Sequence, residues 1–341
     1  FELARRGRRV LALEQFPLVH ARGSSHGQTR IIRRAYYEHP AYVPLAARAF
    51  ARWFDLEQLA GRHLFTACGC LNVGPPGGEL VAGVRRAAAE HALPVQELVG
   101  PEIARRFPAF RFPDDAVGVL EPDAGFLSVE ECVRAHCDMA VSLGAELRPE
   151  EPALSWTAVG DGVEVRTAKG KYHAARLVVT AGAWATTLLA DLGVPLAVLR
   201  QVPVWLRPRE PALFRRDRFP AWIADVPAGV FYGFPMIDPR GAKLAQHYGA
   251  VERPTPDGVD WDARDADEEP VRAFAATHLP ALDGPRTDAS VCLYTATPDR
   301  HFVVDRHPLY PQVAVACGFS GHGFKFAAAV GEALADLAEC G

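Results

Sequence analysis

The sequence predicts a mixed α/β protein, α+β overall, and three observations lead to a fold of two domains. The chain has 341 residues, which is too long for one ordinary hydrophobic core. Near both ends, strand patterns alternate with helix patterns, which is typical of an α/β domain. Between residues 202 and 249, short strands are separated by Pro and Gly, and this pattern favours an antiparallel sheet.

The chain opens with what reads as the end of a helix, residues 1–6, closed by Gly7 before a strand at 10–14. A helix seldom starts in its last turn, because it would lack the turns that nucleate it. We therefore expect a strand, a turn and most of a helix upstream of Phe1. The helical pattern from Glu332 still continues at Gly341, so we expect the chain to be cut at this end too.

The middle of the chain supplies the remaining elements. Apolar residues at helical spacing predict helices, and apolar runs bounded by Gly or Pro predict strands. The expected helices are 41–58, 81–92, 100–107, 128–143 and one from 325 onward, and the expected strands are 70–73, 117–120, 145–147, 163–167, 172–179, 230–235, 243–248 and 313–316.

Two of these elements carry local signals. Ser128 and Glu131 have the spacing of a capping box at the start of a helix. The strands 163–167 and 172–179 read as a hairpin, and the second is almost wholly apolar before it reaches small residues around Gly182. A buried strand that ends in small residues suits the close approach of a ligand.

The composition excludes some classes of binding partner and indicates a cellular compartment. The 37 basic and 41 acidic residues nearly balance, so no electrostatic footprint for nucleic acid or an anionic membrane appears. The longest apolar runs are too short to cross a bilayer. Seven cysteines form an odd count without a disulfide framework, and a reducing compartment is expected. We expect a cytoplasmic monomer, with a peroxisomal address on a missing C-terminus as an open alternative.

Glu14, at the end of the first strand, is the first candidate functional residue. In a dinucleotide-binding unit, an acidic residue at the end of the second strand accepts hydrogen bonds from a ribose. The glycine fingerprint that precedes it by about 20 residues would fall upstream of Phe1. The alternative is an ordinary surface glutamate.

The second candidate is the segment Gly-Ser-Ser-His-Gly-Gln-Thr-Arg-Ile-Ile-Arg at residues 23–33. Its small residues allow backbone to come close to a ligand. Arg30 and Arg33 would share a face if the segment were helical, where they could hold a carboxylate or other negative charge. The alternative is a solvated basic turn.

The third candidate is Gly-Phe-Ser-Gly-His-Gly-Phe-Lys at residues 318–325, between a strand and a helix. Gly318, Gly321 and Gly323 leave backbone N–H groups free near a helix N-terminus, where an anionic acceptor is stabilised. Lys325 stands in the first turn, where a cation is disfavoured, and this hints at a functional role. A merely Gly-rich turn is the alternative.

Other residues carry weaker signals. Taken alone, Cys292 reads as a small core residue. His301, Asp305 and His307 are of types that bind zinc or iron, but nothing else completes a metal site, and strand-to-turn polar residues explain them better. The G-x-S-x-G elbow of a nucleophilic hydrolase does not occur.

Taken together and in this order, the segments resemble the monomeric sarcosine oxidase family, which includes N-methyltryptophan and L-pipecolate oxidases. The likeness runs from about Phe1 to the end and is strongest over 13–36 and 290–332. The segment 318–325, combined with Cys-Leu-Tyr-Thr-Ala-Thr-Pro-Asp at 292–299, is specific to this family. Segment 13–36 looks somewhat nearer to the pipecolate branch.

The resemblance implies a flavoenzyme with a glutathione-reductase-like FAD domain (1–65, 126–197 and 295–341) interleaved with a substrate domain on a large antiparallel sheet (66–125 and 198–294). It implies that the sulfur of Cys292 is bonded to the 8α-methyl carbon of FAD. The resemblance also implies roles for the other candidates. Glu14 would bind the ribose, Ser24, Thr29 and Arg30 would contact the flavin or its phosphates, and His26 would lie close to the flavin ring.

The substrate roles follow in the same way. Arg33 would bind the substrate carboxylate, and Lys325 would contact that carboxylate and lie at the flavin N5 side where oxygen is reduced. Tyr232, His247 and Tyr294 would line the substrate pocket.

The activity that the resemblance implies is oxidation of a small secondary amino acid to an imine, with O₂ reduced to H₂O₂. A related dehydrogenase that passes electrons to a carrier protein is one alternative, and a non-catalytic flavin-binding domain is another. Substrate choice is expected to depend on the pocket volume set by residues such as Ile223 and Phe231.

Overall fold

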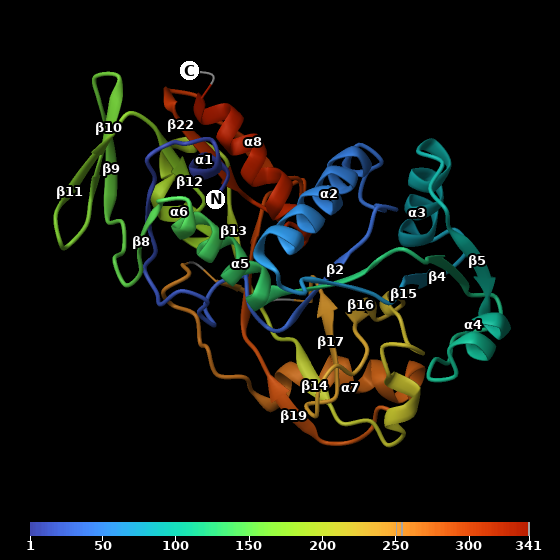
Figure 1. The fold of residues 1–341 in the computed structure, drawn as a ribbon. Coiled ribbons are helices and arrows are strands. Elements are labelled where there is room, and N and C mark those ends of the chain that lie inside the picture. Colours follow the sequence, from blue (N-terminus) through green and yellow to red (C-terminus); the bar gives the residue numbers. More distant parts are fainter. Residues whose placement is uncertain (250, 254, 340–341) are drawn as a thin grey trace.

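The computed structural model describes residues 1–249, 251–253 and 255–339. Figure 1 shows the two ends of the chain and helices α2, α5 and α8 on one side of the molecule, and a large sheet with α7 on the other. The helices are α1 Glu2–Arg5, α2 Tyr42–Ala60, α3 Glu79–Glu90, α4 Gly100–Arg106, α5 Val129–Ser142, α6 Ala185–Leu188, α7 Asp265–His278 and α8 Ala327–Glu339; the 3₁₀ turns are η1 Gly182–Trp184, η2 Ala190–Leu192, η3 Pro211–Phe214 and η4 Phe324–Phe326. Among the residues described, no helix has the length and apolar character needed to span a bilayer.

The large sheet has eight strands in the order β19-β14-β17-β16-β15-β4-β6-β5. They are β4 Cys70–Gly74, β5 Gln96–Val99, β6 Val117–Glu121, β14 Val204–Leu206, β15 Ala221–Val226, β16 Gly229–Gly233, β17 Ala242–His247 and β19 Arg286–Ala289. Neighbours are antiparallel except β15 and β4, which run parallel. Two distant parts of the sequence therefore build one sheet.

Five smaller sheets complete the fold. Parallel pairs join β1 to β8 and β12 to β22, and parallel strands need crossover connections of the kind that helices supply. The strands are β1 Leu11–Leu13 with β8 Glu146–Arg148; β9 Ser155–Val159, β10 Gly162–Arg166 and β11 Lys171–Ala174; β12 Leu177–Val179, β21 Val303–His307 and β22 Tyr310–Cys317; β13 Ala197–Gln201, β18 Val251–Arg253 and β20 Cys292–Ala296; β2 Thr29–Ile32, β3 Phe65–Ala67 and β7 Gly125–Ser128.

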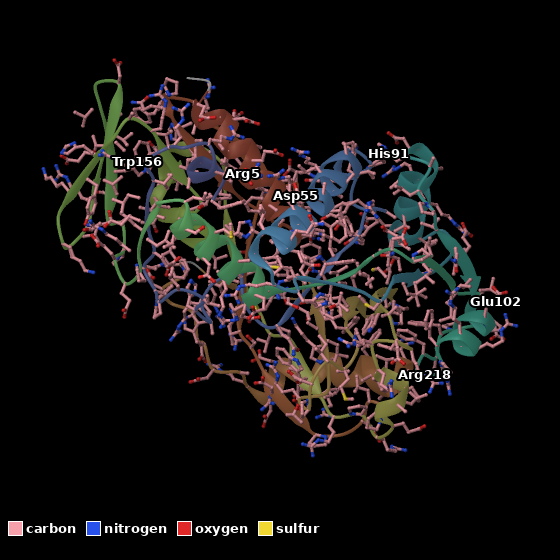
Figure 2. The ribbon with its side chains drawn as sticks, viewed as in Figure 1. Arg5, Asp55, His91, Glu102, Trp156 and Arg218 are labelled. Atoms are coloured by element: carbon pink, nitrogen blue, oxygen red, sulfur yellow. The ribbon has the colours of Figure 1, made fainter. Side chains whose placement is uncertain are left out.

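Two large apolar cores hold these layers together. One lies between the large sheet and α7, where Trp222 stacks on Phe274 with ring centroids 5.2 Å apart. The other lies among α2, α5 and α8, where the buried Trp53 donates its indole N–H to the carbonyl of Lys325 at 2.7 Å. The second core therefore fixes the turn that carries a predicted site residue. The β9–β11 hairpin sheet with Trp156 and the α4 region with Glu102 lie at opposite ends of the molecule (Figure 2).

Several expectations need correction. The segment around Arg30 is a strand, β2, so Arg30 and Arg33 do not share a helical face. Ser128 stands at the N-cap of α5, but its side chain makes no capping hydrogen bond, and the Glu131 carboxylate accepts from Arg62 and Arg134 instead of completing a capping box. The expected arm 172–179 is divided between β11 in the hairpin and β12 in a parallel sheet. The expected helix from Lys325 begins as the 3₁₀ turn η4, before α8.

Candidate functional site

A small cavity of about 80 Å³ brings together most of the predicted catalytic residues. It opens where β2, β16, β17 and β20 meet the loop before α8. Its lining includes Arg30, Arg33, Tyr232, His247, Cys292, Tyr294, Gly321 and Lys325. Residues that are up to 295 positions apart in sequence, Arg30 and Lys325, thus face one space. Cys292 and Lys325 line the same cavity, as a tethered flavin ring facing the lysine requires.

One side of the cavity holds what we call the ion-pair cluster: Arg33, Glu38 and Lys325. The guanidinium of Arg33 is 1 % exposed and donates to the carboxylate of Glu38 at 2.8 Å and to the carbonyl of Ala35 at 2.7 Å. Although burial opposes it, the positive charge of Arg33 lowers the pKa of Glu38. Arg33 Nε is buried without a partner in the described residues, so the group keeps a donor for a further anion.

The ammonium of Lys325 donates to the carbonyl of His322 at 2.8 Å and to the hydroxyl of Tyr36 at 3.3 Å. Burial, reinforced by the charge of Arg33, lowers its pKa to about 7. Burial also lowers the pKa of His322 to about 4, so this imidazole is neutral at neutral pH. Lys325 therefore titrates in the physiological range, next to neutral partners.

Arg30 and Cys292 also line the cavity, and with the neighbouring His26 and Lys243, which do not line it, they form what we call the thiol cluster. The Cys292 sulfur lies 4.0 Å from His26 Nδ1 and 3.7 Å from an Arg30 guanidinium nitrogen. Burial alone raises the pKa of this thiol, but His26, Arg30 and Lys243 outweigh it and lower the pKa to about 6. A buried thiol poised as a thiolate is a nucleophile, not core filler.

Lys243 is a buried cation that the sequence analysis missed. Its side chain is 1 % exposed, and its Nζ donates to the carbonyls of Gly27 and Thr29 and to the Thr29 hydroxyl. In the described part of the chain these hydrogen-bonding partners are all neutral oxygens. Burial and the nearby charge of Arg30 lower its pKa well below the usual value. A single charged residue in the apolar strand Ala242–Leu244 was the available signal, since lysine is almost never fully buried without a partner.

The roof of the cavity is aromatic. The Tyr294 hydroxyl lies 3.0 Å from His247 Nδ1, and Tyr232 packs edge-on against His247. Burial lowers the pKa of His247 to about 3 and raises those of Tyr232 and Tyr294. These groups are therefore uncharged around neutral pH, and they form a polar but neutral wall.

Some predicted residues lie outside this cavity. Glu14 follows β1, where its carboxylate accepts from the Phe16 N–H at 2.9 Å, and Gly182 starts η1 with φ 55° and open space around it. Ser24 donates to the carbonyl of Leu293, and Thr29 holds Lys243. Thr29 thus lies next to Lys243, and Ser24 next to the strand that carries Cys292.

Gly318, Gly321 and Gly323 allow close packing, because a Cβ at any of them would clash with a neighbouring side chain. A Cβ on Gly321 would come within 2.3 Å of the Tyr294 ring, and one on Gly323 within 2.4 Å of the Phe319 ring. Gly318 has φ 64° and would meet Thr297 at 2.5 Å. These glycines let the loop press against β20, and this brings η4 with Lys325 to the cavity.

Two further expectations concern pocket shape and metals. Ile223 lines the cavity, but Phe231 does not: it points into the core and stacks on Phe274 with centroids 4.5 Å apart. Side chains alternate along β16, so Tyr232 faces the cavity and Phe231 faces away. Among the described residues, no group of three or more His, Cys, Asp or Glu side chains is placed to hold a metal ion.

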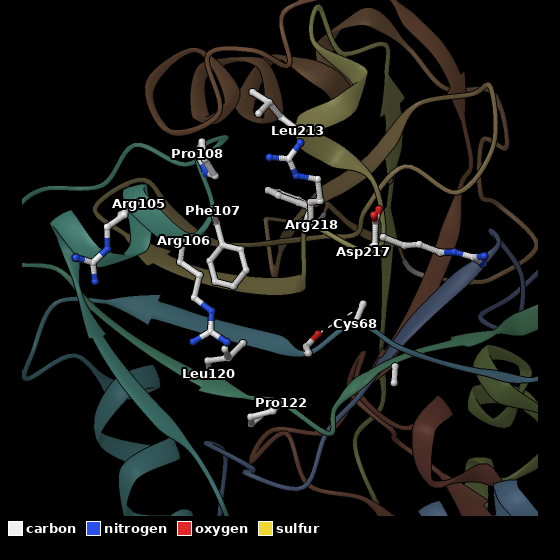
Figure 3. Close-up of a pocket in the computed structure, with 14 residues that line it drawn as sticks. Cys68, Arg105, Arg106, Phe107, Pro108, Leu120, Pro122, Leu213, Asp217 and Arg218 are labelled. Atoms are coloured by element: carbon white, nitrogen blue, oxygen red, sulfur yellow. Dashed lines mark hydrogen bonds between the residues drawn. The ribbon is translucent and has the colours of Figure 1, made fainter.

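A larger hollow of about 610 Å³ lies elsewhere, between the η3 region and α4 (Figure 3). Its rim carries the exposed Arg105, Arg106, Arg216 and Arg218. None of the predicted site residues lines it, and its charged groups face solvent. Size alone does not make it the reactive site, because the perturbed titratable groups converge in the smaller cavity.

The residues present fit a flavin at the smaller cavity. His26 Nε2 is buried and has no partner in the described residues, and buried polar atoms normally have one. The backbone of Gly27 lies close to the thiol cluster, because a Cβ there would be in contact with Ser290, Cys292 and Lys243 at 3.6–3.8 Å. Positive charge from Arg30 and Lys243 suits a ring that becomes anionic on reduction.

Comparison with known proteins agrees with this site. The family model described as FAD dependent oxidoreductase matches residues 1–337. Monomeric sarcosine oxidase of Streptomyces avermitilis is 45% identical over 99% of this chain and 89% of its own length. N-methyl-L-tryptophan oxidase of Yersinia pestis is 34% identical, over 98% of this chain and 89% of its own. The solved structure of NikD, described as an unusual amino acid oxidase essential for nikkomycin biosynthesis, superposes with a TM-score of 0.86 at 26% identity, covering 99% of this chain and 89% of that one.

Proposed function

Because this chain belongs to the FAD-dependent oxidoreductases, within the monomeric sarcosine oxidase family, and is an FAD-dependent amine oxidoreductase, we propose that it oxidises a small secondary amino acid with O₂ as acceptor. The candidate substrates are sarcosine, another N-methyl amino acid or L-pipecolate. The observation that carries the proposal is the convergence of Arg33 and Lys325 with a buried thiolate in one cavity.

The ion-pair cluster selects a substrate carboxylate. Arg33 offers a planar fork of donors, which suits a carboxylate, and Lys325 adds a second cation beside it. In the free protein, Glu38 occupies Arg33. A substrate carboxylate therefore exchanges with, or joins, an internal carboxylate, and it gains hydrogen bonds without leaving Arg33 unpaired.

The aromatic roof favours the neutral amine. A secondary amine must lose its proton before it can give up a hydride equivalent. His247 is uncharged and Tyr232 and Tyr294 are protonated at neutral pH, so the wall supplies no negative charge that would hold an ammonium. Burial lowers the pKa of a bound amine, and Glu38, the carboxylate that lines the cavity, is already paired with Arg33.

FAD, when bound, would supply the acceptor for the hydride equivalent, which carries both electrons of the oxidation. The thiol cluster would hold its dimethylbenzene end, with Cys292 supplying the thiolate for a covalent tether and Glu14 meeting the ribose at the far end. His26 and Arg30 keep the Cys292 sulfur deprotonated. The covalent bond is part of the proposal.

We also propose that Lys243 has the larger share of the oxygen reaction, which the sequence-based interpretation gave to Lys325. A substrate or product carboxylate would neutralise Lys325, whereas Lys243 is held only by neutral oxygens. Negative charge that develops nearby would raise the pKa of Lys243 and draw a proton to it. Once protonated, the Lys243 side chain would stabilise such charge strongly, because its hydrogen bonds already hold it in place.

A substrate panel with peroxide readout tests the function. Sarcosine, L-pipecolate and N-methyltryptophan are mixed with the flavin-loaded protein in air, and we expect bleaching of the flavin followed by stoichiometric H₂O₂. Reduction by substrate with reoxidation only by an added carrier would replace the oxidase with a dehydrogenase. If none of the amines bleaches the flavin, the protein would be a non-catalytic flavin-binding domain.

A further inference from the structure

The backbone that holds Lys243 is itself in an uncommon conformation. Gly27 has φ 86° and Gln28 has φ 72°. For a non-glycine residue the left-handed region costs on the order of 1–3 kcal/mol, and it persists only where the surroundings impose it. Because the kink aims the carbonyls of Gly27 and Thr29 at the ammonium, whatever imposes the kink also places Lys243.

Backbone contacts supply part of this constraint. One carboxylate oxygen of Glu130 accepts from the N–H groups of Gly27, at 2.8 Å, and Gln28, at 3.1 Å. The N–H of Val129 donates to the Gln28 carbonyl at 3.0 Å. The start of α5 thus holds the kink through three hydrogen bonds to residues 27 and 28.

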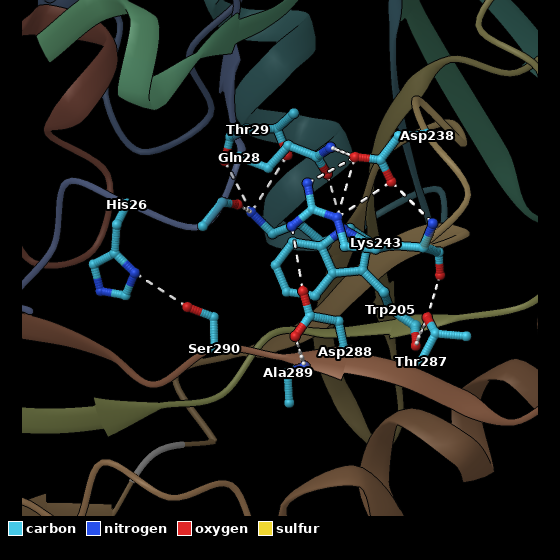
Figure 4. Close-up of polar contacts among 12 residues, drawn as sticks. His26, Gln28, Thr29, Trp205, Asp238, Lys243, Thr287, Asp288, Ala289 and Ser290 are labelled. Carbon is cyan, nitrogen blue, oxygen red and sulfur yellow. Dashed lines mark hydrogen bonds and ion pairs between the residues drawn. The ribbon is translucent and has the colours of Figure 1, made fainter. Parts of the chain in front are cut away.

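The Gln28 side chain supplies the rest, and it bridges the large sheet and the loop between β16 and β17 (Figure 4). Its carbonyl oxygen accepts from the indole N–H of Trp205 at 2.8 Å, and its amide nitrogen donates to Asp238 at 2.7 Å. Asp238 is also paired with Arg240 at 2.7 Å. Both polar atoms of the Gln28 amide are therefore hydrogen-bonded, one to β14 and one to this loop.

The Trp205 end of the bridge lies directly beside Lys243 in the sheet. Trp205 on β14 is the direct cross-strand partner of Lys243 on β17 and of Asp288 on β19. The Lys243 ammonium lies 5.4 Å from the centroid of the Trp205 ring. Trp205 is buried, at 1 % exposed. Its hydrogen bond to Gln28 therefore fixes the position of the kink relative to a rigid side chain beside Lys243.

We propose that Gln28 is a positioning residue for the oxygen reaction, through its bridge from Trp205 to Asp238. An amide satisfies both ends at once, because an indole N–H can only donate, a carboxylate can only accept, and the amide offers one acceptor and one donor. A carboxylate at position 28 would accept from Trp205 but repel Asp238. The inference rests on the proposed function of Lys243, and it adds a second requirement: that the 27–29 kink be locked to the sheet.

The test uses the full flavin-loaded protein with Gln28→Ala, Gln28→Gly and Trp205→Phe. Trp205→Phe keeps an aromatic ring beside Lys243 and removes the indole donor together with the five-membered part of the ring. Gln28→Gly accepts the positive φ without strain, so it separates the backbone conformation from the side-chain bridge. Gln312→Ala and Trp156→Phe are matched controls, because Gln312 donates to the Gly162 carbonyl and Trp156 to the Leu188 carbonyl in a distant part of the molecule.

Two readouts are measured. Hydrogen–deuterium exchange of the peptide covering 26–33 reports the kink directly, and we expect about tenfold faster exchange in all three variants, since losing a buried hydrogen bond costs about 1–3 kcal/mol. Stopped-flow reoxidation of the reduced flavin by O₂ should slow by about tenfold, with the KM for substrate changed less than twofold. The controls should match the unmodified chain in both.

The outcomes separate the inference from the function. Faster exchange and slower reoxidation with an unchanged KM support the positioning role. Unchanged exchange in both Gln28→Ala and Trp205→Phe overturns it, whatever the activity. Faster exchange with unchanged reoxidation also overturns it, because the kink would then be irrelevant to oxygen. If no amine reduces the flavin, the proposed substrate class fails, while dithionite-reduced flavin still allows the reoxidation measurement.

Discussion

The two ends of the cavity hold positive charge in opposite ways. In the ion-pair cluster, Arg33 is neutralised by Glu38, and Lys325 stands beside them. In the thiol cluster, Lys243 is held by carbonyls and aromatic faces, and the anionic groups that act on it are Cys292 and Glu130. One end is arranged to exchange one carboxylate for another, and the other is arranged to receive charge that appears only during the reaction.

This difference explains why burial has different consequences at the two ends. A buried pair with a carboxylate partner keeps its charge at all ordinary pH values, which suits recognition in the ground state. A buried ammonium with only neutral acceptors has a strongly lowered pKa, and its protonation follows the negative charge around it. Interactions that strengthen only as charge develops are the ones that accelerate a reaction.

The largest expected effect separates the thiol cluster from an ordinary buried cysteine. We expect Cys292→Ala to abolish covalent flavin, so that acid precipitation leaves nearly all of the yellow colour in the supernatant. Cys317→Ala is the matched control, because Cys317 is also buried but burial raises its pKa to about 11. Colour retained in the Cys292→Ala pellet would mean that another residue forms the bond.

The next test breaks the ion-pair cluster. Arg33→Met should lower kcat/KM for the amino acid by roughly 10³-fold, because removing one partner of a buried charge pair costs about 2–5 kcal/mol. Most of the loss should appear in KM. Arg52→Met is the control: Arg52 is a buried arginine paired with Glu2 and Asp55 away from the cavity, so it should lower stability and leave kcat/KM within about threefold. A small effect of Arg33→Met would remove the carboxylate assignment.

The two lysines sharpen the comparison. Lys243→Met should slow reoxidation of the reduced flavin by about 10²-fold, the loss expected for one preorganised charge-stabilising donor, with a smaller effect on substrate KM. Lys325→Met should chiefly raise substrate KM and leave the flavin attached. Stopped-flow reoxidation measures the oxygen reaction of each variant, and steady-state kinetics measures its substrate KM. Slower reoxidation in Lys325→Met than in Lys243→Met would return the oxygen role to the interpretation made from sequence.

The sequence predicted the fold class, the family and most residues of the cavity, because those signals are local. Segments 292–299 and 318–325 carry their glycines, thiol and lysine at fixed spacing. It could not predict Lys243 or Glu38, because their significance comes from burial beside groups distant in sequence. It also placed Phe231 on the wrong side of β16, since alternation along a strand fixes two faces without saying which one meets the cavity. The helical reading of Arg30 failed because pairing with β7 decided the backbone conformation.

The smallest expected effect is a pH dependence of carboxylate binding. Lys325 has a pKa of about 7, so it is charged below that pH and neutral above it. The Kd of an amine-free carboxylate such as propionate, followed by its perturbation of the flavin spectrum, should therefore rise above pH 7 by several-fold and then level off, since Arg33 remains charged throughout. A bound carboxylate stabilises the ammonium and moves the break in the complex to a higher pH.

The lowered pKa of Lys325 also predicts how the free energy of unfolding changes with pH. The pKa of Lys325 in the folded chain lies below the usual value of 10.5, so between pH 7 and 10.5 the unfolded chain binds this proton more tightly. The free energy of unfolding should therefore rise with pH across that window by an amount due to Lys325. Lys325→Met should remove both the rise in Kd and this contribution to stability. A Kd for propionate that is flat from pH 6 to 9 in the unmodified chain would place the ammonium outside the carboxylate site, and the contrast between the two ends would then rest on Arg33 and Glu38 alone.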